Sequence, residues 1–166
     1  MDTKTNFKVA VVMGSASDLP VMQGAIDALN DFGVAVEAHV LSAHRQPHEM
    51  VAFGRDARRL GFSVVIAGAG GAAHLPGMLA ATTTLPVIGV PVSATKLDGM
   101  DALLAIVQMP KGVPVATVAI DGARNAGLLA VSMLSIHDEA LAQQLDAMKV
   151  DLAAHAAAQD AEHFGQ

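Results

Sequence analysis

The sequence predicts a three-layer α/β/α sandwich around a parallel five-stranded sheet, followed by a C-terminal helical extension. Five short Val- and Ile-rich runs lack polar alternation, which is typical of strands covered on both faces. Segments with the helical spacing of apolar residues separate these runs, and the connections between them are short. A chain that alternates strands and helices in this way forms a parallel sheet with helices on both faces.

Each expected element can be placed on the chain. The five expected strands are Lys8–Met13, Ala35–Leu41, Ser63–Ala67, Pro86–Val90 and Val115–Ile120. The expected helices are Leu19–Phe32, His48–Leu60, Leu75–Ala81, Met100–Val107 and Ala123–Leu134. Right-handed crossovers between these units give a flavodoxin-like architecture.

A further helix is expected after Ser135, whose hydroxyl would cap the backbone N–H near Asp138. Its apolar residues recur at helical spacing, at Leu141, Leu145, Met148 and Leu152. We interpret this stripe as a packing surface for a neighbouring subunit, because a one-sided apolar helix needs something to cover it. We therefore expect a single domain over residues 1–166, with an α/β core at 8–134 and a helix and tail at 135–166 that pack between subunits.

The composition limits the classes of function that the chain can have. Hydrophobic residues make up 52% of the chain and charged residues only 16%, so we expect a homo-oligomer rather than a monomer. The net charge of −6, without a basic run, disfavours nucleic-acid binding. The chain contains no cysteine, which excludes disulfides and thiol chemistry and suits the cytoplasm. Residues 1–6 are polar and do not resemble a secretory signal.

The segment from Leu60 to Thr95 contains no Asp, Glu, Lys or Arg and could be mistaken for a membrane span. A span needs about 20 predominantly apolar residues, whereas glycines and prolines interrupt this segment repeatedly. We interpret it as buried sheet core with turns, and we expect no membrane partner.

Three glycine- and serine-rich junctions accompany the ends of the first three expected strands, at residues 13–18, 42–47 and 67–77. In an open parallel sheet the ligand lies outside the carboxyl ends of the strands. The sequence therefore predicts that the three junctions converge on one crevice.

The first junction combines Gly14, which permits a sharp turn, with Ser15, Ser17 and Asp18 before a helix. One interpretation is that Ser17 or Asp18 caps the helix, with Pro20 in its first turn. The other is a ligand site, in which backbone N–H groups and serines bind phosphate and the carboxylate binds ribose hydroxyls. The sequence leaves both open, and the P-loop pattern is absent.

At the second junction we expect Pro47 to be the first helical residue, which leaves His44 and Arg45 in a loop above the sheet. An imidazole beside a guanidinium is suited to proton transfer near neutral pH, and the guanidinium to holding an anionic group. His44 and His48 could share a metal only on a continuous helix, which Pro47 disfavours, so we expect no metal site.

At the third junction, repeated Gly and Ala let the main chain approach a flat ligand, and His74 lies near the start of the next helix. The alternative is a tight turn with a capping histidine. The spacing of Gly68, Gly70 and Gly71 does not match a dinucleotide-binding fingerprint.

With these motifs in place, the chain resembles the N5-carboxyaminoimidazole ribonucleotide mutase family, the class I enzymes of de novo purine (IMP) synthesis. The resemblance rests on the segments Met13–Asp18, Ser42–Pro47, Ala67–Met78, Thr84–Pro91, Leu103–Pro110, Gly112–Val118 and Asn125–Ala130. It implies an isomerase that moves a carboxylate from the exocyclic nitrogen of an aminoimidazole ribotide to ring carbon C4. It implies no ATP, metal or organic cofactor, and an octamer with sites near subunit interfaces.

The resemblance also implies roles for individual residues. His44 matches the catalytic histidine, which donates a proton during decarboxylation and accepts one after recarboxylation. The implied substrate-binding residues are Ser15, Ser17, Asp18, Ser42, Arg45, Gly71 and His74. Two segments depart from the family: residues 91–97 lack its loop glutamine, and residues 122–124 look shortened. We expect neither departure to touch the three junctions.

Two other functions remain. The related class II carboxylase uses free CO2 and shares most of the site residues, so only overall similarity favours the mutase. A non-enzymatic flavodoxin-like nucleotide-binding module is the third possibility. A flavin module would normally offer aromatic stacking, whereas this chain has no Trp or Tyr.

Overall fold

The computed structural model describes residues 7–165. Residues 1–6, where no secretory signal is expected, lie outside the described residues, as does Gln166. Of the described residues, 7–131 form one compact unit and 132–165 form a second. This division lies close to the boundary between residues 134 and 135 at which the sequence separates the α/β core from the C-terminal extension.

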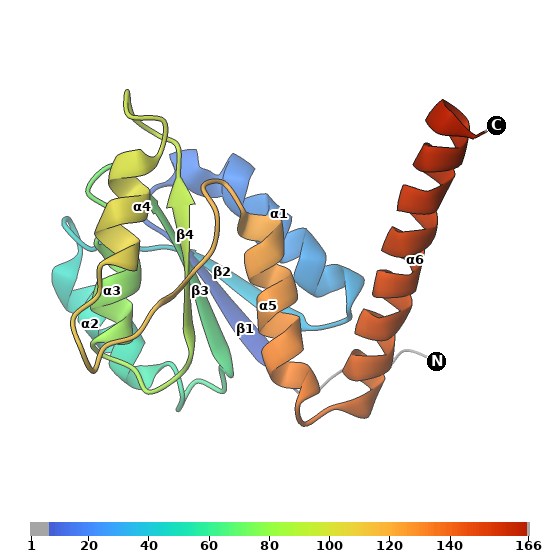
Figure 1. Cartoon of the computed structure of the whole chain (residues 1–166). Helices are drawn as coiled ribbons and strands as arrows, with labels where there is room; N and C mark the ends of the chain where they lie inside the picture. Colours follow the sequence, from blue (N-terminus) through green and yellow to red (C-terminus); the bar gives the residue numbers. More distant parts are fainter. Residues whose placement is uncertain (1–6, 166) are drawn as a thin grey trace. The chain divides into compact units, whose positions relative to one another are not determined.

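The first unit contains a five-stranded sheet whose neighbouring strands are all parallel (Figure 1). The strands are β1 (Lys8–Met13), β2 (Ala35–Val40), β3 (Val64–Gly70), β4 (Val87–Val92) and β5 (Ala116–Thr117). Their order is β2-β1-β3-β4-β5, which confirms the predicted flavodoxin-like sheet. The chain changes direction across the sheet between β1 and β3, the point at which open sheets of this kind bind their ligands.

Helices cover both faces of this sheet. They are α1 (Leu19–Asp31), α2 (Pro47–Asp56), α3 (Leu75–Ala80), α4 (Met100–Val107) and α5 (Ala123–Ser135), with a 3-10 turn, η1 (Ala16–Asp18), before α1. Figure 1 shows α2, α3 and α4 on one face and α1 with α5 on the other. The three predicted layers are confirmed.

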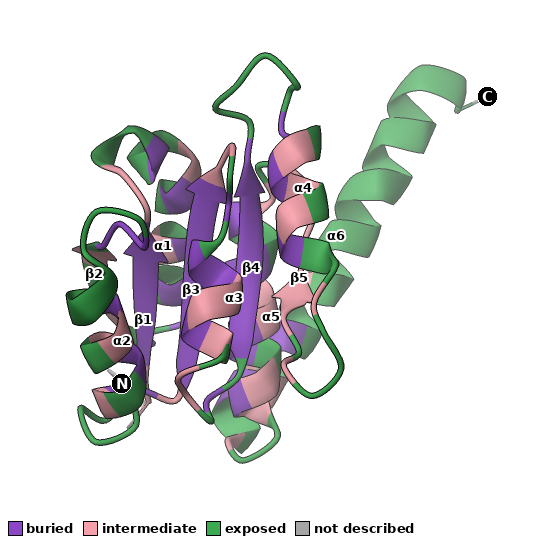
Figure 2. Ribbon diagram, turned by 90° about the vertical axis from the view of Figure 1, so that its left-hand side faces the viewer, coloured by how far each residue is buried: buried purple, intermediate pink, exposed green. Residues whose placement is uncertain are grey.

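The core lies along the three central strands, which are buried almost throughout (Figure 2). The edge strand β2 differs, since its residues are all exposed or half-buried and Val40 is 52% exposed. The expectation that all five strands are covered on both faces is therefore wrong for the two edge strands, because β2 has no buried residue and both residues of β5 are half-buried.

Strand β5 is much shorter than the expected Val115–Ile120. Pro114, which has no N–H to donate, lies just before it. The N–H of Val118 donates to Gly89 O at 3.0 Å and that of Asp121 to Pro91 O at 2.8 Å. The segment therefore follows β4 beyond Thr117, but the bonds are too irregular for a longer strand.

Helix α2 begins at Pro47, as expected, but ends at Asp56 rather than at Leu60. Helical turns continue past Asp56, because the N–H of Leu60 still donates to Asp56 O at 2.9 Å. They stop at Gly61, whose φ of +85° is a left-handed conformation that favours glycine.

The second unit contains α6 (Glu139–Phe164). Asp138 caps this helix, since its carboxylate accepts the N–H of Leu141 at 3.1 Å. The expectation that Ser135 is the cap is wrong. Ser135 is the last residue of α5 and its hydroxyl donates to Ser132 O at 2.8 Å, because the chain needs two more residues to turn before α6.

The apolar stripe of α6 is buried only in its first turns. Leu141 and Leu145 are buried and Met148 is half-buried, whereas Leu152 is 60% exposed. Its interpretation as a packing surface for another subunit stays a prediction. Within residues 7–165 no helix has both the length and the apolar character needed to cross a membrane.

Candidate active site

The three junctions converge on one cavity of about 360 Å³ at the carboxyl ends of the strands, as predicted. Its lining residues are Gly14, Ser17, Asp18, Ser42, Ala43, His44, Arg45, Ala69, Gly70, Ala72, Leu75, Ala94 and Thr95. Five of the expected site residues are in this set: Ser17, Asp18, Ser42, His44 and Arg45. The other three, Ser15, Gly71 and His74, adjoin the lining residues along the chain without lining the cavity themselves.

The first junction folds into η1, which is closed by a capping box. The hydroxyl oxygen of Ser15 accepts the N–H of Ser17 at 3.3 Å and its hydroxyl at 2.9 Å. The Asp18 carboxylate accepts the N–H of Ser15 at 3.1 Å. Ser15 therefore caps η1, whereas Asp18 occupies the N-cap position of α1 without a side-chain hydrogen bond to that helix. The interpretation that Ser17 or Asp18 caps α1 is wrong, because the chain makes one 3-10 turn before α1 begins. Pro20 lies in the first turn of α1, as expected.

Asp18 is the buried charged group of the cavity, with only 4% of its surface exposed. Burial raises the pKa of its carboxyl above the ordinary 3.8, although hydrogen bonds from the Ser15 backbone and the Ser17 side chain oppose this shift. A carboxylate that loses water in this way gains from any ligand hydroxyl that donates to it. The cavity wall therefore offers a carboxylate that can accept a hydrogen bond from a ligand hydroxyl.

Arg45 connects the second junction to the first. Its Nε donates to Ser42 Oγ at 3.1 Å, and its Nη2 donates to Gly14 O at 3.3 Å. Ser42 is itself buried, and its N–H donates to Gln46 Oε1 at 3.2 Å. These bonds fix the guanidinium at the cavity, where its remaining donors can hold an anion.

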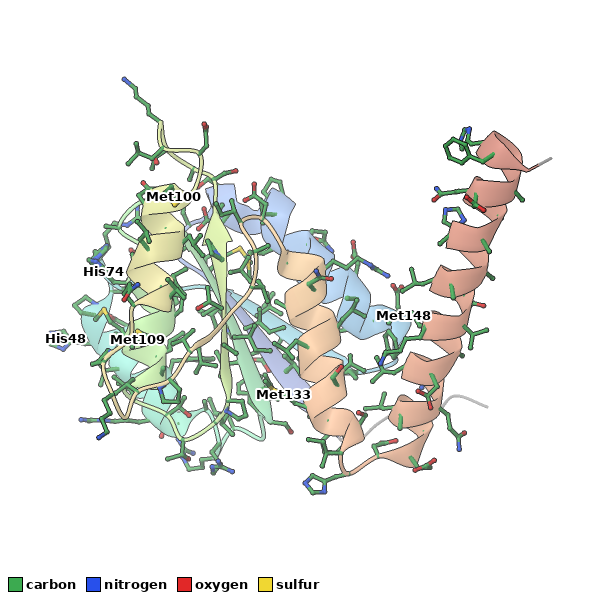
Figure 3. All side chains as sticks on the ribbon, viewed as in Figure 1. His48, His74, Met100, Met109, Met133 and Met148 are labelled. Atoms are coloured by element: carbon green, nitrogen blue, oxygen red, sulfur yellow. The ribbon has the colours of Figure 1, made fainter. Side chains whose placement is uncertain are left out.

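The geometry gives no support to a metal site at His44 and His48. Gln46 has a non-helical φ of −133°, as expected before Pro47, so the two histidines do not share a helix. The exposed His48 points outward from α2 (Figure 3). Over residues 7–165, no cluster of three or more His, Asp or Glu side chains is arranged to hold a metal ion.

The third junction brings the end of β3 close to the loop that follows β4. A Cβ on Gly70 would lie 2.5 Å from Ala94 Cβ and 3.0 Å from Val92 O, so only glycine lets β3 end this close to the loop after β4. Gly71 has a left-handed φ of +61°, which turns the chain toward α3. The glycines therefore shape a narrow wall of the cavity.

His74 occupies the N-cap position of α3, but its side chain forms no hydrogen bond with the helix. The alternative of a capping histidine is therefore wrong. Instead, Nδ1 of His74 lies 2.8 Å from Nε2 of His44, and the two rings are inclined by 83°. Both side chains are exposed at the mouth of the crevice.

Sequence reasoning missed Ala94 and Thr95, which line the cavity from the loop after β4. The Thr95 hydroxyl donates to Asp101 Oδ2 at 2.6 Å, which ties this loop to the start of α4. The expectation that the departure at 91–97 does not touch the junctions is wrong, because β4 pairs with β3 and ends at the same edge of the sheet. The expected neighbouring position of these parallel strands could have indicated that the loop after β4 reaches the cavity.

Backbone N–H groups at the starts of two helices also lie beside the crevice. Helices α2 and α3 begin beside it without a side-chain cap, which leaves N–H groups of their first turns without side-chain partners. Such ends favour anions. These features define an α/β protein with a parallel flavodoxin-like sheet. At its switch point, a buried carboxylate, a fixed guanidinium and an exposed imidazole form a cavity suited to a small anionic ligand.

The model of the AIR carboxylase family matches residues 8–155, and the chain belongs to this family. It is 57% identical over 155 residues to the N5-carboxyaminoimidazole ribonucleotide mutase of Mycobacterium leprae, covering 93% of this chain and 91% of that protein. The protein of the same name from Saccharolobus solfataricus is 54% identical over 145 residues, covering 87% and 92% of the two chains.

Among solved structures, Treponema denticola PurE superposes with a TM-score of 0.84, covering 96% of this chain and 99% of that one. Its sequence is 24% identical to this chain, so this likeness concerns the fold.

Proposed function

We propose that this protein is an N5-carboxyaminoimidazole ribonucleotide mutase of purine biosynthesis. It moves the carboxylate of its ribotide substrate from the exocyclic nitrogen to ring carbon C4. The observation that carries the proposal is 57% identity to a protein of that name over 93% of the chain, combined with a family match that spans all three junctions.

His44 serves as the general acid and base of this reaction. Decarboxylation breaks the N–C bond of the carbamate, and the departing nitrogen takes a proton from the imidazolium. Formation of the C4–carboxylate bond then releases the C4 proton, which the neutral imidazole accepts. One group therefore ends each turnover in its starting state, which an imidazole can do near neutral pH.

The substrate is held by Ser15, Ser17, Asp18, Ser42 and Arg45, with Gly71 beside the ring and its carboxylate. Arg45 and the first turns of α2 and α3 supply positive potential for the phosphate. The buried Asp18 carboxylate accepts hydroxyl groups of the ribose. The reaction requires released CO2 to stay beside C4, which is a proximity effect, and the glycine-lined wall of the cavity is where we place it.

The test is an assay without added cofactor that supplies either the N-carboxylated ribotide or the uncarboxylated ribotide with bicarbonate. We expect rapid conversion of the first substrate only. Rapid conversion of the second would identify a class II carboxylase. Binding without conversion of either would identify a nucleotide-binding module.

The proton-carrying role of His44 predicts the result of His44→Asn. This variant should bind the ribotide nearly as well as the wild type but lose at least about 10²-fold in kcat, the typical contribution of general acid–base catalysis. Ribotide titration and turnover are measured on the same preparation. Near-normal turnover would remove His44 from the mechanism.

Arg45→Ala should raise the ribotide Kd by about 10- to 100-fold, since a charged hydrogen bond contributes roughly 1.5–3 kcal/mol. Arg59→Ala is the matched control, because Arg59 follows the far end of α2 and pairs at the surface with Asp56 at 2.9 Å. Equal dissociation constants in the two variants would show that Arg45 does not hold the phosphate.

We also propose that the protein is a cytoplasmic homo-octamer. Large apolar side chains remain exposed on α4 and the loop before it, at Leu97, Met100, Leu104 and Val107. Such a stripe is typical of a surface that another subunit covers. Sedimentation should give an octamer, and a monomer at micromolar concentration would contradict the proposal.

A further inference from the structure

We propose that His74 is a positioning residue: its Nδ1 accepts a hydrogen bond from Nε2–H of His44, so that Nδ1 of His44 is the nitrogen that transfers the proton. This inference rests on the proposed function, in which His44 carries the proton.

The geometry of the pair supports a direct hydrogen bond. The distance of 2.8 Å between His44 Nε2 and His74 Nδ1 lies within the usual range for hydrogen-bonded nitrogens. The rings are nearly perpendicular, with centroids 4.9 Å apart, so the contact joins two ring edges rather than two stacked faces. Among residues 7–165, this is the one hydrogen bond that the His44 ring forms, and it leaves Nδ1 of His44 available to a substrate.

The main chain of His74 is held in place. Its N–H donates to Ala72 O at 2.8 Å, and its carbonyl accepts the N–H of Met78 at 3.0 Å in the first turn of α3. His44 lies in the turn between β2 and α2, which the N–H of Gln46 closes by donating to Ser42 O at 2.8 Å. Both main chains are therefore held in place, and the bond between the two rings orients the exposed His44 side chain.

Proton balance decides which ring donates. As an acid, His44 is an imidazolium with protons on both nitrogens, so Nε2–H must donate and Nδ1 of His74 must accept. After His44 gives its Nδ1 proton to the substrate nitrogen, it remains a neutral ring with Nε2–H still bonded to His74. It can then accept the C4 proton at Nδ1, which restores the imidazolium.

The opposite arrangement cannot complete this cycle. If Nδ1–H of His74 donated to Nε2 of His44, the proton of neutral His44 would be on Nδ1. Giving up that proton would then leave an imidazolate, which is not accessible near neutral pH. Two imidazolium rings facing each other at 2.8 Å would repel, so the contact requires one ring to donate its N–H and the other to accept it.

The decisive comparison uses His74→Leu and His74→Asn. Leucine removes the acceptor, whereas the Asn side-chain oxygen can take roughly the place of Nδ1. We expect His74→Leu to lower kcat by about 10- to 100-fold, the scale of a misplaced catalytic group, with KM within about 2-fold of the wild type. His74→Asn should recover most of the lost kcat. His48→Leu is the matched control, because it removes an exposed histidine outside the cavity and should leave both constants unchanged.

A wild-type kcat in His74→Leu would overturn the inference. So would a raised KM with kcat intact, which would make His74 a substrate-binding residue, or an Asn variant no better than the Leu variant. Because the His74 side chain is exposed, both variants should keep the wild-type Tm, and loss of fold in either would also count against a purely positioning role. If the wild type itself fails to convert the N-carboxylated ribotide, the proposed function fails. That result differs from a failure of the His74 inference, which requires an active wild type and shows only in the variants.

Nitrogen-15 NMR of histidine-labelled protein tests the tautomer separately from activity. The His44 signals are assigned by their loss in His44→Asn. In the neutral ring we expect the proton on Nε2 of His44. A proton on Nδ1 would overturn the assignment of the reactive nitrogen.

Discussion

Gly70→Ala tests whether the narrow cavity wall depends on close contact between the ends of β3 and β4. The added Cβ would lie 2.5 Å from Ala94 Cβ and 3.0 Å from Val92 O. Carbon atoms pack at roughly 3.5–4.0 Å, so the two chains must separate by about 1 Å. Neither neighbour is the end of a flexible side chain, and overpacking of this kind costs about 1–3 kcal/mol. At about 2–4 °C per kcal/mol for a chain of this size, Tm should fall measurably.

The same displacement should reduce activity, because Gly70 and Ala94 both line the cavity. A shift of about 1 Å in a site can cost about 10²-fold in rate. Thermal unfolding and turnover are measured on the same variant. Gly14→Ala is the control for stability, since its Cβ would meet Asp18 Oδ2 at 3.7 Å and Ala69 Cβ at 3.8 Å, which are ordinary contacts. Wild-type values of both Tm and kcat in Gly70→Ala would refute the reasoning.

Two further predictions concern stability. Because burial raises the pKa of Asp18, its ionised form destabilises the fold above that pKa, and the penalty fades as the pH falls toward 3.8. Asp18→Asn should therefore raise Tm at pH 7, with a gain that shrinks on acidification, while it weakens ribotide binding; a gain that grows on acidification would contradict the assigned cause. Asp138→Ala should destabilise α6 by about 1 kcal/mol through loss of its cap, and Ser135→Ala should do less; equal Tm values in a thermal melt would contradict the cap assignment.

The central strands and most of the helices could be predicted from the sequence because burial leaves a direct signal in the residues: unbroken apolar runs in strands covered on both faces, and helical spacing of apolar residues in helices covered on one. Lys8–Met13 and Met100–Val107 were predicted with the bounds that the structure shows. The errors lie where apolar content does not decide the outcome. The ends of β5 and α2 depend on Pro114 and Gly61, and the α6 cap depends on how many residues the preceding turn needs.

The convergence of the site could also be predicted, because the carboxyl ends of parallel strands meet at the same edge of a sheet. The contact between His44 and His74 could not, because a ring orientation depends on side-chain packing rather than on spacing along the chain. The contribution of Ala94 and Thr95 was within reach of the same topological argument, but small side chains give no chemical signal in a sequence.

The uncapped starts of α2 and α3 carry a consequence for motion. A side-chain cap typically stabilises a helix end by about 1 kcal/mol, and α6 has one at Asp138. Helices α2 and α3 have none, so their first turns should open locally more often than their middles. A bound phosphate would take the place of the missing caps. Substrate binding would then stabilise the first turns of α2 and α3. Amide hydrogen exchange should therefore slow more in these two turns than in the rest of residues 7–165 when substrate is added.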